Sequence, residues 1–254
     1  MDPKMMNLDQ PASPDSTAWS EDNTSQFLDY GKYFVYEREY QMETICRLIP
    51  DPGRAFRVLE LCCGEGLLAE QVLERFPLSS LRGLDGSQGM LVKASQRLDR
   101  FGERFSPGLF NLAESGWRAA ERPAWSVLSS LAIHHLDEAG KEQLFKDVYA
   151  LLEPGGVFLI ADLVRPEDEL GLAYAAWAYD EAVRQRALEL DGSERAFELF
   201  QKLEWNYFHH PEDPMDKPST LPAQLGWLRQ SGFLAVDVFW LRGGHAIFGG
   251  RKPG

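Results

Sequence analysis

Short apolar runs alternate with amphipathic stretches through the middle of the chain. The run 57–61, reading RVLEL, is followed at 66–76 by GLLAEQVLERF, whose apolar side chains recur at helical spacing. The same order returns where LRGLD, which ends at Asp85, precedes MLVKASQRL. Each pair predicts a strand, a loop and a helix.

Three more apolar runs extend this pattern. FSPGLFNL at 105–112 predicts a third strand, AWSVLSSLAIHHL at 124–136 contains a fourth, and VFLIAD at 157–162 predicts a fifth. The helical pattern KEQLFKDVYALL and the turn EPGG separate the last two. Strands that alternate with helices of about ten to fifteen residues are typical of right-handed βαβ crossovers. The sequence therefore predicts an α/β fold with a Rossmann-like, doubly wound parallel sheet.

The alternation stops at 163–220, where helical, aromatic-rich sequence such as LAYAAWAYDEAVRQRALEL appears. We interpret this segment as a helical lid insertion. Beyond it, LPAQLGWLRQSGF predicts a helix that ends at Gly232. AVDVFWL and HAIFGG then flank Gly243 and Gly244, which predicts a terminal antiparallel hairpin.

The N-terminal part of the chain lies outside the alternating pattern. Residues 1–24 are rich in Asp, Ser, Pro and Asn, and we expect them to form a disordered leader. Apolar residues at mixed helical spacing predict a helical segment at 25–52. A chain of 254 residues, 44% hydrophobic and 26% charged, suits one globular unit, so we expect a single domain at 25–254.

Charge, hydropathy and cysteine content indicate which partners and which compartment suit the chain. The net charge of −13 disfavours nucleic acid, because binding to nucleic acid depends on Lys and Arg that neutralise phosphates. No window approaches the roughly 18 continuous apolar residues of a membrane span, so we expect no membrane association. Cys46, Cys62 and Cys63 form neither a disulfide framework nor a CxxC spacing, which favours the reducing cytoplasm. The sequence leaves the oligomeric state open.

A nucleotide loop is predicted directly after the first strand. GEGLLA at 64–69 satisfies the GxGxxG/A pattern, and Asp85 follows about 20 residues later, as a residue that holds a ribose diol would. This spacing indicates a nucleoside and leaves an NAD-dependent oxidoreductase open. Glu60, however, places a carboxylate where a dinucleotide has its pyrophosphate, and the two would repel. A cofactor with a cationic amine and a sulfonium would instead be attracted.

Five segments in this order resemble the class I S-adenosylmethionine-dependent methyltransferases. They are VLELCCGEG, the strand end at Asp85, SSLAIHHL, LLEPGGVFLIAD, and LRQSGF with the hairpin after it, and the resemblance covers 56–165 and 221–251. It implies a seven-stranded sheet with an antiparallel last strand and S-adenosylmethionine at the carboxyl ends of the strands. It also implies methyl transfer, with the acceptor atom undecided between oxygen, nitrogen, carbon and sulfur.

The resemblance also implies the residues that hold the cofactor. Glu60, Gly64 and Gly66 would line the methionine part, Asp85 would bind the ribose hydroxyls, and Asn111 would lie near the adenine amine. The full expected set is Glu60, Leu61, Cys62, Gly64, Gly66, Asp85, Gly86, Met90, Asn111, Leu112 and Leu131. Cys62 stands where the family commonly has the first glycine of its loop. We expect an ordinary φ at Cys62 and retained binding.

Catalytic and acceptor residues are predicted less directly. His134, at the end of the fourth strand, is the candidate general base, and the alternative is that one of His134 and His135 only hydrogen-bonds a loop carbonyl. Aromatic residues in the N-terminal segment and the insertion favour a small-molecule acceptor. The expected acceptor residues are Tyr33, His135, Trp177, Trp205 and His245.

Other interpretations remain beside this one. His209, His210, Asp213 and Asp216 match no metal-ligand spacing, so we expect a solvated loop there and no metal. A non-catalytic S-adenosylmethionine-binding protein is a second possibility. A synthase that modifies S-adenosylmethionine is a third, and it requires a basic residue in the pocket to hold a second carboxylate.

Overall fold

The computed structural model describes the backbone of residues 21–254 and the side chains from Leu28 onward. The first helix, α1, spans Glu21–Phe34 and so begins inside the expected leader 1–24. The rest of that leader, residues 1–20, lies outside the described residues. No helix of the described part is both long and apolar enough to cross a membrane.

Seven strands form one sheet in the order β3-β2-β1-β4-β5-β7-β6. The strands are β1 (Phe56–Leu61), β2 (Ser79–Asp85), β3 (Phe105–Leu109), β4 (Ala124–Ser130), β5 (Leu152–Leu163), β6 (Leu234–Arg242) and β7 (His245–Arg251). β1 to β5 pair in parallel, whereas β7 is antiparallel to both β5 and β6. The predicted doubly wound sheet with its terminal hairpin is confirmed.

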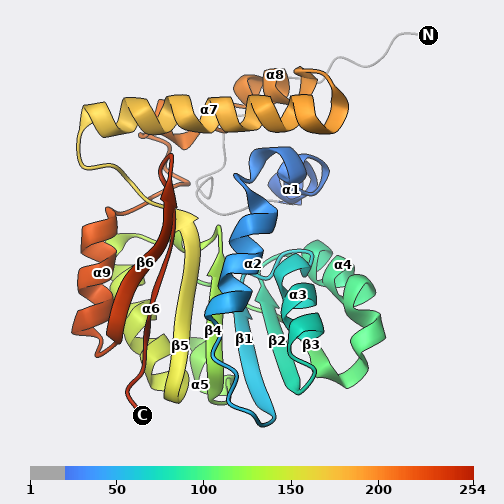
Figure 1. Ribbon diagram of the computed structural model, residues 1–254, viewed down its shortest axis with the longest axis vertical. Helices are drawn as coiled ribbons and strands as arrows, with labels where there is room; N and C mark the ends of the chain where they lie inside the picture. The colour runs from blue at the N-terminus through green and yellow to red at the C-terminus, as the bar shows by residue number, and fades with distance from the viewer. Residues whose placement is uncertain (1–20) are drawn as a thin grey trace.

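Helices cover both faces of the sheet (Figure 1). One face carries α2 (Arg38–Leu48), α3 (Leu67–Arg75) and α4 (Gln88–Leu98), and the other α5 (Gly116–Ala120), α6 (Glu138–Leu151) and α9 (Leu221–Gln230). Short 3-10 helices lie at Asp99–Arg104 (η1), Ile133–His135 (η2) and Tyr207–His209 (η3). Polar caps begin several helices: the Ser87 hydroxyl accepts from Met90 N, and the Thr220 hydroxyl from Ala223 N.

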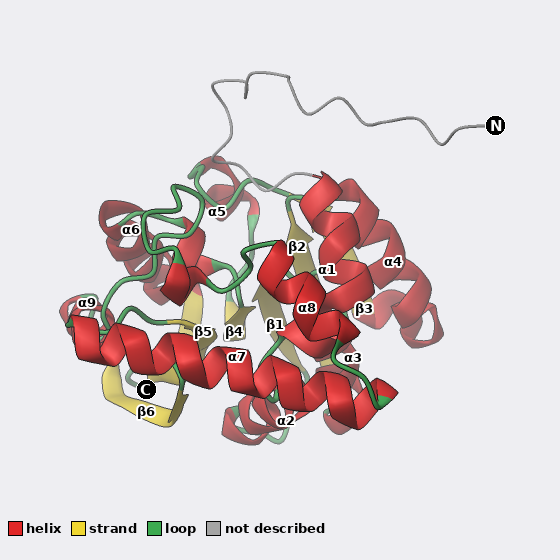
Figure 2. Ribbon diagram, turned by 90° about the horizontal axis from the view of Figure 1, so that it is seen from above, coloured by secondary structure: helices red, strands yellow, loops and turns green. Residues whose placement is uncertain are grey.

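The insertion crosses the edge where the parallel strands end. It contains α7 (Glu169–Asp191) and α8 (Arg195–Lys202), and Figures 1 and 2 show α7 lying over the strand ends, with α1 and α8 beside it. Phe34, Tyr179 and Phe200 belong to one apolar cluster that joins α1 to the insertion. The Tyr179 hydroxyl donates to Phe34 O at 2.9 Å.

Two glycine-to-alanine changes test the packing of the sheet. A Cβ at Gly249 in β7 would overlap the Phe158 carbonyl oxygen of the neighbouring strand, whereas a Cβ at Gly226 in α9 would meet nothing within 4 Å. We expect Gly249→Ala to lower the free energy of unfolding by about 2 kcal/mol or more. Gly226→Ala should raise it by about 0.5–1 kcal/mol. Urea unfolding measures both, and equal stability of the two variants would contradict this packing.

Candidate active site

A small cavity lies at the end of β1. It has a volume of about 60 Å³, and Glu60, Gly64 and Leu131 are among the residues that line it. Glu60 is 2% exposed, and its Oε2 has no hydrogen-bond partner among the described residues. Burial, with the charge of Asp85, raises the pKa of Glu60 to about 8. Among the described residues, Glu60 Oε2 thus has no hydrogen-bond donor, beside a cavity that Arg38 also lines.

The loop after β1 has three residues in the left-handed region. Gly64 and Gly66 have φ of 54° and 82°, and a Cβ at Gly66 would lie 3.0 Å from Leu98 in α4. Cys62 has φ of 57°, so the expectation of an ordinary φ there is wrong. This left-handed conformation costs a residue with a Cβ, such as cysteine, about 1–2 kcal/mol.

The Asp85 carboxylate connects the loop after β1 to the start of α4. It is the last residue of β2 and is 8% exposed. Its Oδ2 accepts from Gly64 N at 2.8 Å, and its Oδ1 accepts from Ser87 N at 2.9 Å. The carboxylate thus fixes the position of the Gly64 loop relative to the start of α4.

The other expected cofactor residues are spread more widely. Leu61 is fully buried in the core, Gly86 directly follows Asp85, and Met90 is buried in the first turn of α4. Asn111 and Leu112 follow β3, where Asn111 is exposed and its side-chain amide donates to Glu114 at 3.1 Å. The cavity itself brings together only Glu60, Cys62, Gly64 and Leu131 of the expected set.

The sequence reasoning missed the wall of this cavity that comes from the N-terminal helices. Val35, Arg38, Gln41 and Met42 line it from the junction of α1 and α2. Burial lowers the pKa of Arg38, while the charges of Glu65 and Glu39 oppose that shift. The residues match no motif, because the packing of α2 on the sheet brings them to the cavity. A pocket that binds an anionic group needs a basic residue, and Arg38 is a basic residue in the wall of this cavity.

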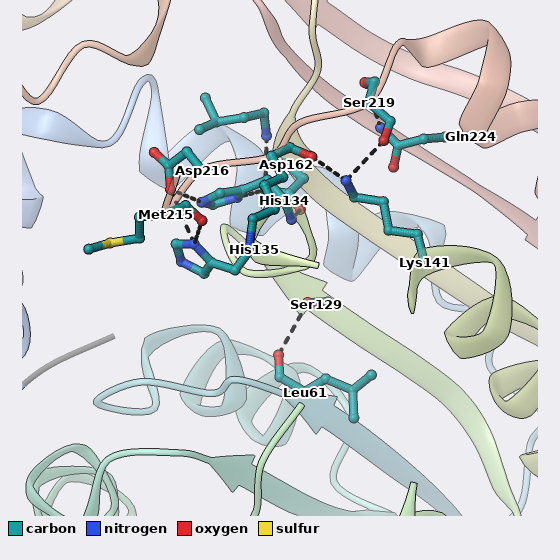
Figure 3. A network of polar contacts seen from close by, with 12 residues as sticks. Leu61, Ser129, His134, His135, Lys141, Asp162, Met215, Asp216, Ser219 and Gln224 are labelled. Carbon is teal, nitrogen blue, oxygen red and sulfur yellow. Dashed lines mark hydrogen bonds and ion pairs between the residues drawn. The ribbon is translucent and has the colours of Figure 1, made fainter. Parts of the chain in front are cut away.

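His134 lies between two carboxylates (Figure 3). Its Nδ1 is 2.5 Å from Asp162 Oδ1, its backbone N–H donates to Asp162 Oδ2 at 2.9 Å, and its Nε2 is 3.5 Å from Asp216 Oδ1. Burial alone would lower the pKa of His134, but the charges and hydrogen bonds of Asp162 and Asp216 raise it to about 10. Because both ring nitrogens face carboxylates, this arrangement does not support His134 as a general base.

His135 and Asp216 correct the interpretation of the second histidine cluster. His135 Nδ1 is 3.1 Å from Asp216 Oδ1 and 3.3 Å from the Met215 carbonyl oxygen. Although burial opposes it, hydrogen bonds and charges from His134 and His135 hold the pKa of Asp216 well below its usual range. Asp216 is therefore part of the site rather than of a solvated loop. His209, by contrast, is exposed and pairs with Asp180 at 2.8 Å.

The expected acceptor residues do not converge on the cavity. Tyr33 is buried, and its hydroxyl donates to Asp191 Oδ2 at 2.7 Å, while Trp205 packs against Phe34 with ring centroids 5.3 Å apart. His245 is buried beside Tyr179, at 4.6 Å between ring centroids, and burial lowers its pKa to about 4. Trp177 is 60% exposed. His135 lies in η2, after β4, and His245 begins β7 opposite Leu163 at the end of β5.

Known proteins share this sequence pattern. Residues 58–156 match the family described as "Methyltransferase domain". The chain is 30% identical over 125 residues to trans-aconitate 2-methyltransferase of Variovorax paradoxus (strain S110), covering 49% of this chain and 44% of that enzyme. It is 24% identical over 187 residues to carboxy-S-adenosyl-L-methionine synthase of Chromohalobacter salexigens, covering 72% and 63%. The chain thus spans less than two thirds of the length of these curated relatives.

A solved structure shares the fold. An O-methyltransferase family protein from Burkholderia thailandensis superposes with a TM-score of 0.63 at 18% sequence identity. The match covers 91% of this chain and 60% of that one. It extends the likeness from the matched segment 58–156 to nearly the whole described chain, the insertion included.

The strain at Cys62 is testable with two small substitutions. Cys62→Gly and Cys62→Ala both remove the thiol, but only glycine adopts the left-handed region without steric cost. We expect Cys62→Gly to be more stable than Cys62→Ala by about 1 kcal/mol in urea unfolding. An alanine variant at least as stable as the glycine variant would contradict a strained backbone at this position.

The raised pKa of Glu60 makes stability depend on pH in a defined direction. With a pKa of about 8 in the folded protein and about 4.5 when unfolded, the folded state holds the proton that the unfolded state releases. Stability therefore falls as pH rises from about 4.5 to about 8. Glu60→Gln removes this term, so its stability relative to wild type should grow by a few kcal/mol across the window.

The control for this effect is Glu103→Gln, because Glu103 is exposed. Urea unfolding of wild type, Glu60→Gln and Glu103→Gln at several pH values measures the pH dependence of stability in each. Groups that titrate in all three proteins contribute equally, so the difference is the contribution of Glu60. A difference between Glu60→Gln and wild type that stays constant with pH would show that Glu60 is ionised in the folded protein.

Proposed function

We propose that this chain, a member of the class I S-adenosylmethionine-dependent methyltransferase family, transfers a methyl group from S-adenosylmethionine to a small-molecule acceptor. The observation that carries the proposal is the buried Glu60 carboxylate beside a cavity, whose Oε2 has no hydrogen-bond partner among the described residues. A buried carboxylate of this kind is stable in its charged form only beside a cation. S-adenosylmethionine has two cationic groups, an amine and a sulfonium, whereas the pyrophosphate of NAD is anionic.

The residues at the strand ends fit the parts of this cofactor. Glu60 would hold the amine of the methionine part, and Asp85 the ribose hydroxyls. Contacts from Gly64 N and Ser87 N hold the Asp85 carboxylate at the Gly64 loop and at the start of α4. A Cβ at Gly64 would meet nothing within 4 Å, so the backbone leaves space at this point of the loop. Arg38 offers a guanidinium at the same cavity for the methionine carboxylate.

The reaction asks little acid–base chemistry of the protein. The bound cofactor supplies a methyl group on a positively charged sulfur, which is electrophilic. The chain's own task is to align the acceptor and exclude water. The insertion suits the second task, because α7 lies across the strand ends and its apolar cluster with α1 closes that side. His134 is held by Asp162 and Asp216, which favours a positioning role over proton abstraction.

The aromatic packing of the lid and the negative net charge of the chain support a small-molecule acceptor. Aromatic rings of α1 and the insertion, among them Phe34, Tyr179 and Trp205, pack against one another instead of forming a basic groove. The net charge of −13 opposes binding of a phosphate backbone. The Variovorax relative is named for a small organic acid, trans-aconitate, which supports the same class.

A second candidate function is synthesis of a carboxylated S-adenosylmethionine. Its requirement is a basic residue for a second carboxylate, in addition to Arg38, which lines the cavity with Glu60 and is placed above at the methionine carboxylate. The Chromohalobacter relative is named for that reaction. The mass of the product distinguishes the two functions, because one yields a methylated acceptor and the other a heavier cofactor.

Isothermal titration with S-adenosylmethionine tests the assignment of Glu60. Loss of a charge-assisted hydrogen bond is worth about 1.5–3 kcal/mol, so Glu60→Gln should weaken binding at least about tenfold, and Glu103→Gln should not. At pH 7 the binding should release a proton from Glu60, which appears as a dependence of the heat on the buffer's ionisation enthalpy. That dependence should vanish in Glu60→Gln.

Two results would contradict the proposed function. One is no uptake of S-adenosylmethionine at millimolar concentration, with NAD bound instead. The other is binding without transfer of labelled methyl to any compound of a broad small-molecule screen, which would favour the non-catalytic binding protein.

A further inference from the structure

Three side chains of types that commonly bind metals lie together beside the end of β4, and they come from two distant segments. His134 and His135 lie in η2, and Asp216 lies in the loop before α9. One ligand atom from each residue lies within 4.8 Å of the others. Figure 3 shows the Asp216 carboxylate directed at both imidazole rings. Sequence spacing does not reveal the group, because about 80 residues separate the histidines from Asp216.

The distances within the group match ligand spacing. Asp216 Oδ1 lies 3.5 Å from His134 Nε2 and 3.1 Å from His135 Nδ1. The 3.1 Å contact also falls within the hydrogen-bond range of about 2.7–3.2 Å, whereas the 3.5 Å contact lies beyond it. Two ligands of a tetrahedral Zn²⁺, each about 2.0–2.1 Å from the ion, are about 3.3–3.4 Å apart. One carboxylate oxygen thus faces two imidazole nitrogens at the separation that a shared ion would set.

A further carboxylate orients the first histidine. Asp162 Oδ1 is 2.5 Å from His134 Nδ1, and Asp162 Oδ2 accepts the backbone N–H of His134 at 2.9 Å. Asp162 is itself fixed by Leu163 N, which donates to its Oδ1 at 2.9 Å. Histidines that bind a metal through one nitrogen characteristically donate the other N–H to a carboxylate, and this pairing sets their tautomer. The contact leaves Nε2 of His134 as the nitrogen that faces Asp216.

We infer that His134, His135 and Asp216 bind a divalent transition-metal ion such as Zn²⁺, with Asp162 as the partner that orients His134. Two imidazole nitrogens and one carboxylate oxygen favour such an ion over Mg²⁺ or Ca²⁺, which prefer oxygen ligands. The ion's charge balances Asp162 and Asp216.

The site is open to a further ligand. His135 and Asp216 each keep 23% of their side-chain surface exposed, so an ion can enter from solvent. Three protein ligands leave a fourth position for water or another oxygen donor, as in catalytic zinc sites. The site lies a few residues after Leu131, which lines the cavity of Glu60. The idea that an oxygen of the methyl acceptor binds the ion at this position rests on the proposed function. The metal site itself does not depend on that function.

Equilibrium dialysis of the full chain against Zn²⁺, after removal of metal with a chelator, tests the site without cofactor or acceptor. We expect one ion per chain at micromolar Zn²⁺. With Co²⁺ in place of Zn²⁺, the visible absorption of the bound ion reports nitrogen and oxygen ligands. Titration with S-adenosylmethionine is measured separately on the metal-free protein, so failure of the metal site and failure of the proposed function are distinguishable.

The variants identify the ligands. His135→Ala and Asp216→Asn should each weaken Zn²⁺ binding at least tenfold, and Asp162→Asn should weaken it about 10–100-fold through the orientation of His134. The matched control is the double variant His209→Ala/His210→Ala, which removes the other adjacent histidine pair and should bind Zn²⁺ like wild type. Circular dichroism confirms that each variant is folded.

Three outcomes would overturn the inference. They are no stoichiometric Zn²⁺ on the folded wild-type chain, binding that is unchanged in both His135→Ala and Asp216→Asn, and binding lost in the His209/His210 control. Any of them would leave the group as an ion-paired cluster that holds the loop before α9.

Discussion

Three carboxylates are buried where the parallel strands end, and each needs compensation because an unpaired buried charge costs several kcal/mol. Asp85 accepts from two backbone amides, and Asp162 is paired with the His134 ring and with the amides of His134 and Leu163. Glu60 is different: one of its oxygens has no partner among the described residues, and burial raises its pKa. The fold therefore pairs Asp85 and Asp162 within the protein, whereas the raised pKa of Glu60 means that burial favours the neutral form of this carboxyl unless a nearby cation stabilises its charge.

Apolar packing and polar contacts both hold the insertion against the carboxyl ends of the parallel strands. Its helices share an apolar cluster with α1, whereas the loop before α9 is held by polar contacts: Lys217 N donates to His134 O at 2.8 Å, and the Lys141 ammonium donates to Ser219 Oγ at 2.9 Å. Lys141 is fully buried, which lowers its pKa to about 8. These contacts hold the loop before α9 against η2 and α6. The same contacts bring Asp216 to His134 and His135.

The sequence predicted what depends on local pattern. Strand and helix order follows from periodicity, and the position of Glu60 four residues before Gly64 was enough to favour a cationic cofactor. What it missed depends on contacts between distant segments. Arg38 reaches the cavity only because α2 packs on the sheet, and Asp216 reaches the histidines only because the loop folds back. His134 is a less direct candidate base in the structure because Asp216, from the distant loop before α9, faces its Nε2 at 3.5 Å.

The backbone at the cavity is strained where the ligand is expected. Cys62 and Leu131 both line the cavity with φ of 57° and 53°, a conformation that costs a residue with a Cβ about 1–2 kcal/mol. Hydrogen bonds to neighbouring strands hold both loops: Cys63 N donates to Leu84 O at 2.9 Å, and Leu131 N donates to Ala161 O at 2.8 Å. Strain of this kind persists only when the surroundings over-determine it. Contacts to neighbouring strands therefore hold the strained conformations of Cys62 and Leu131 beside the cavity.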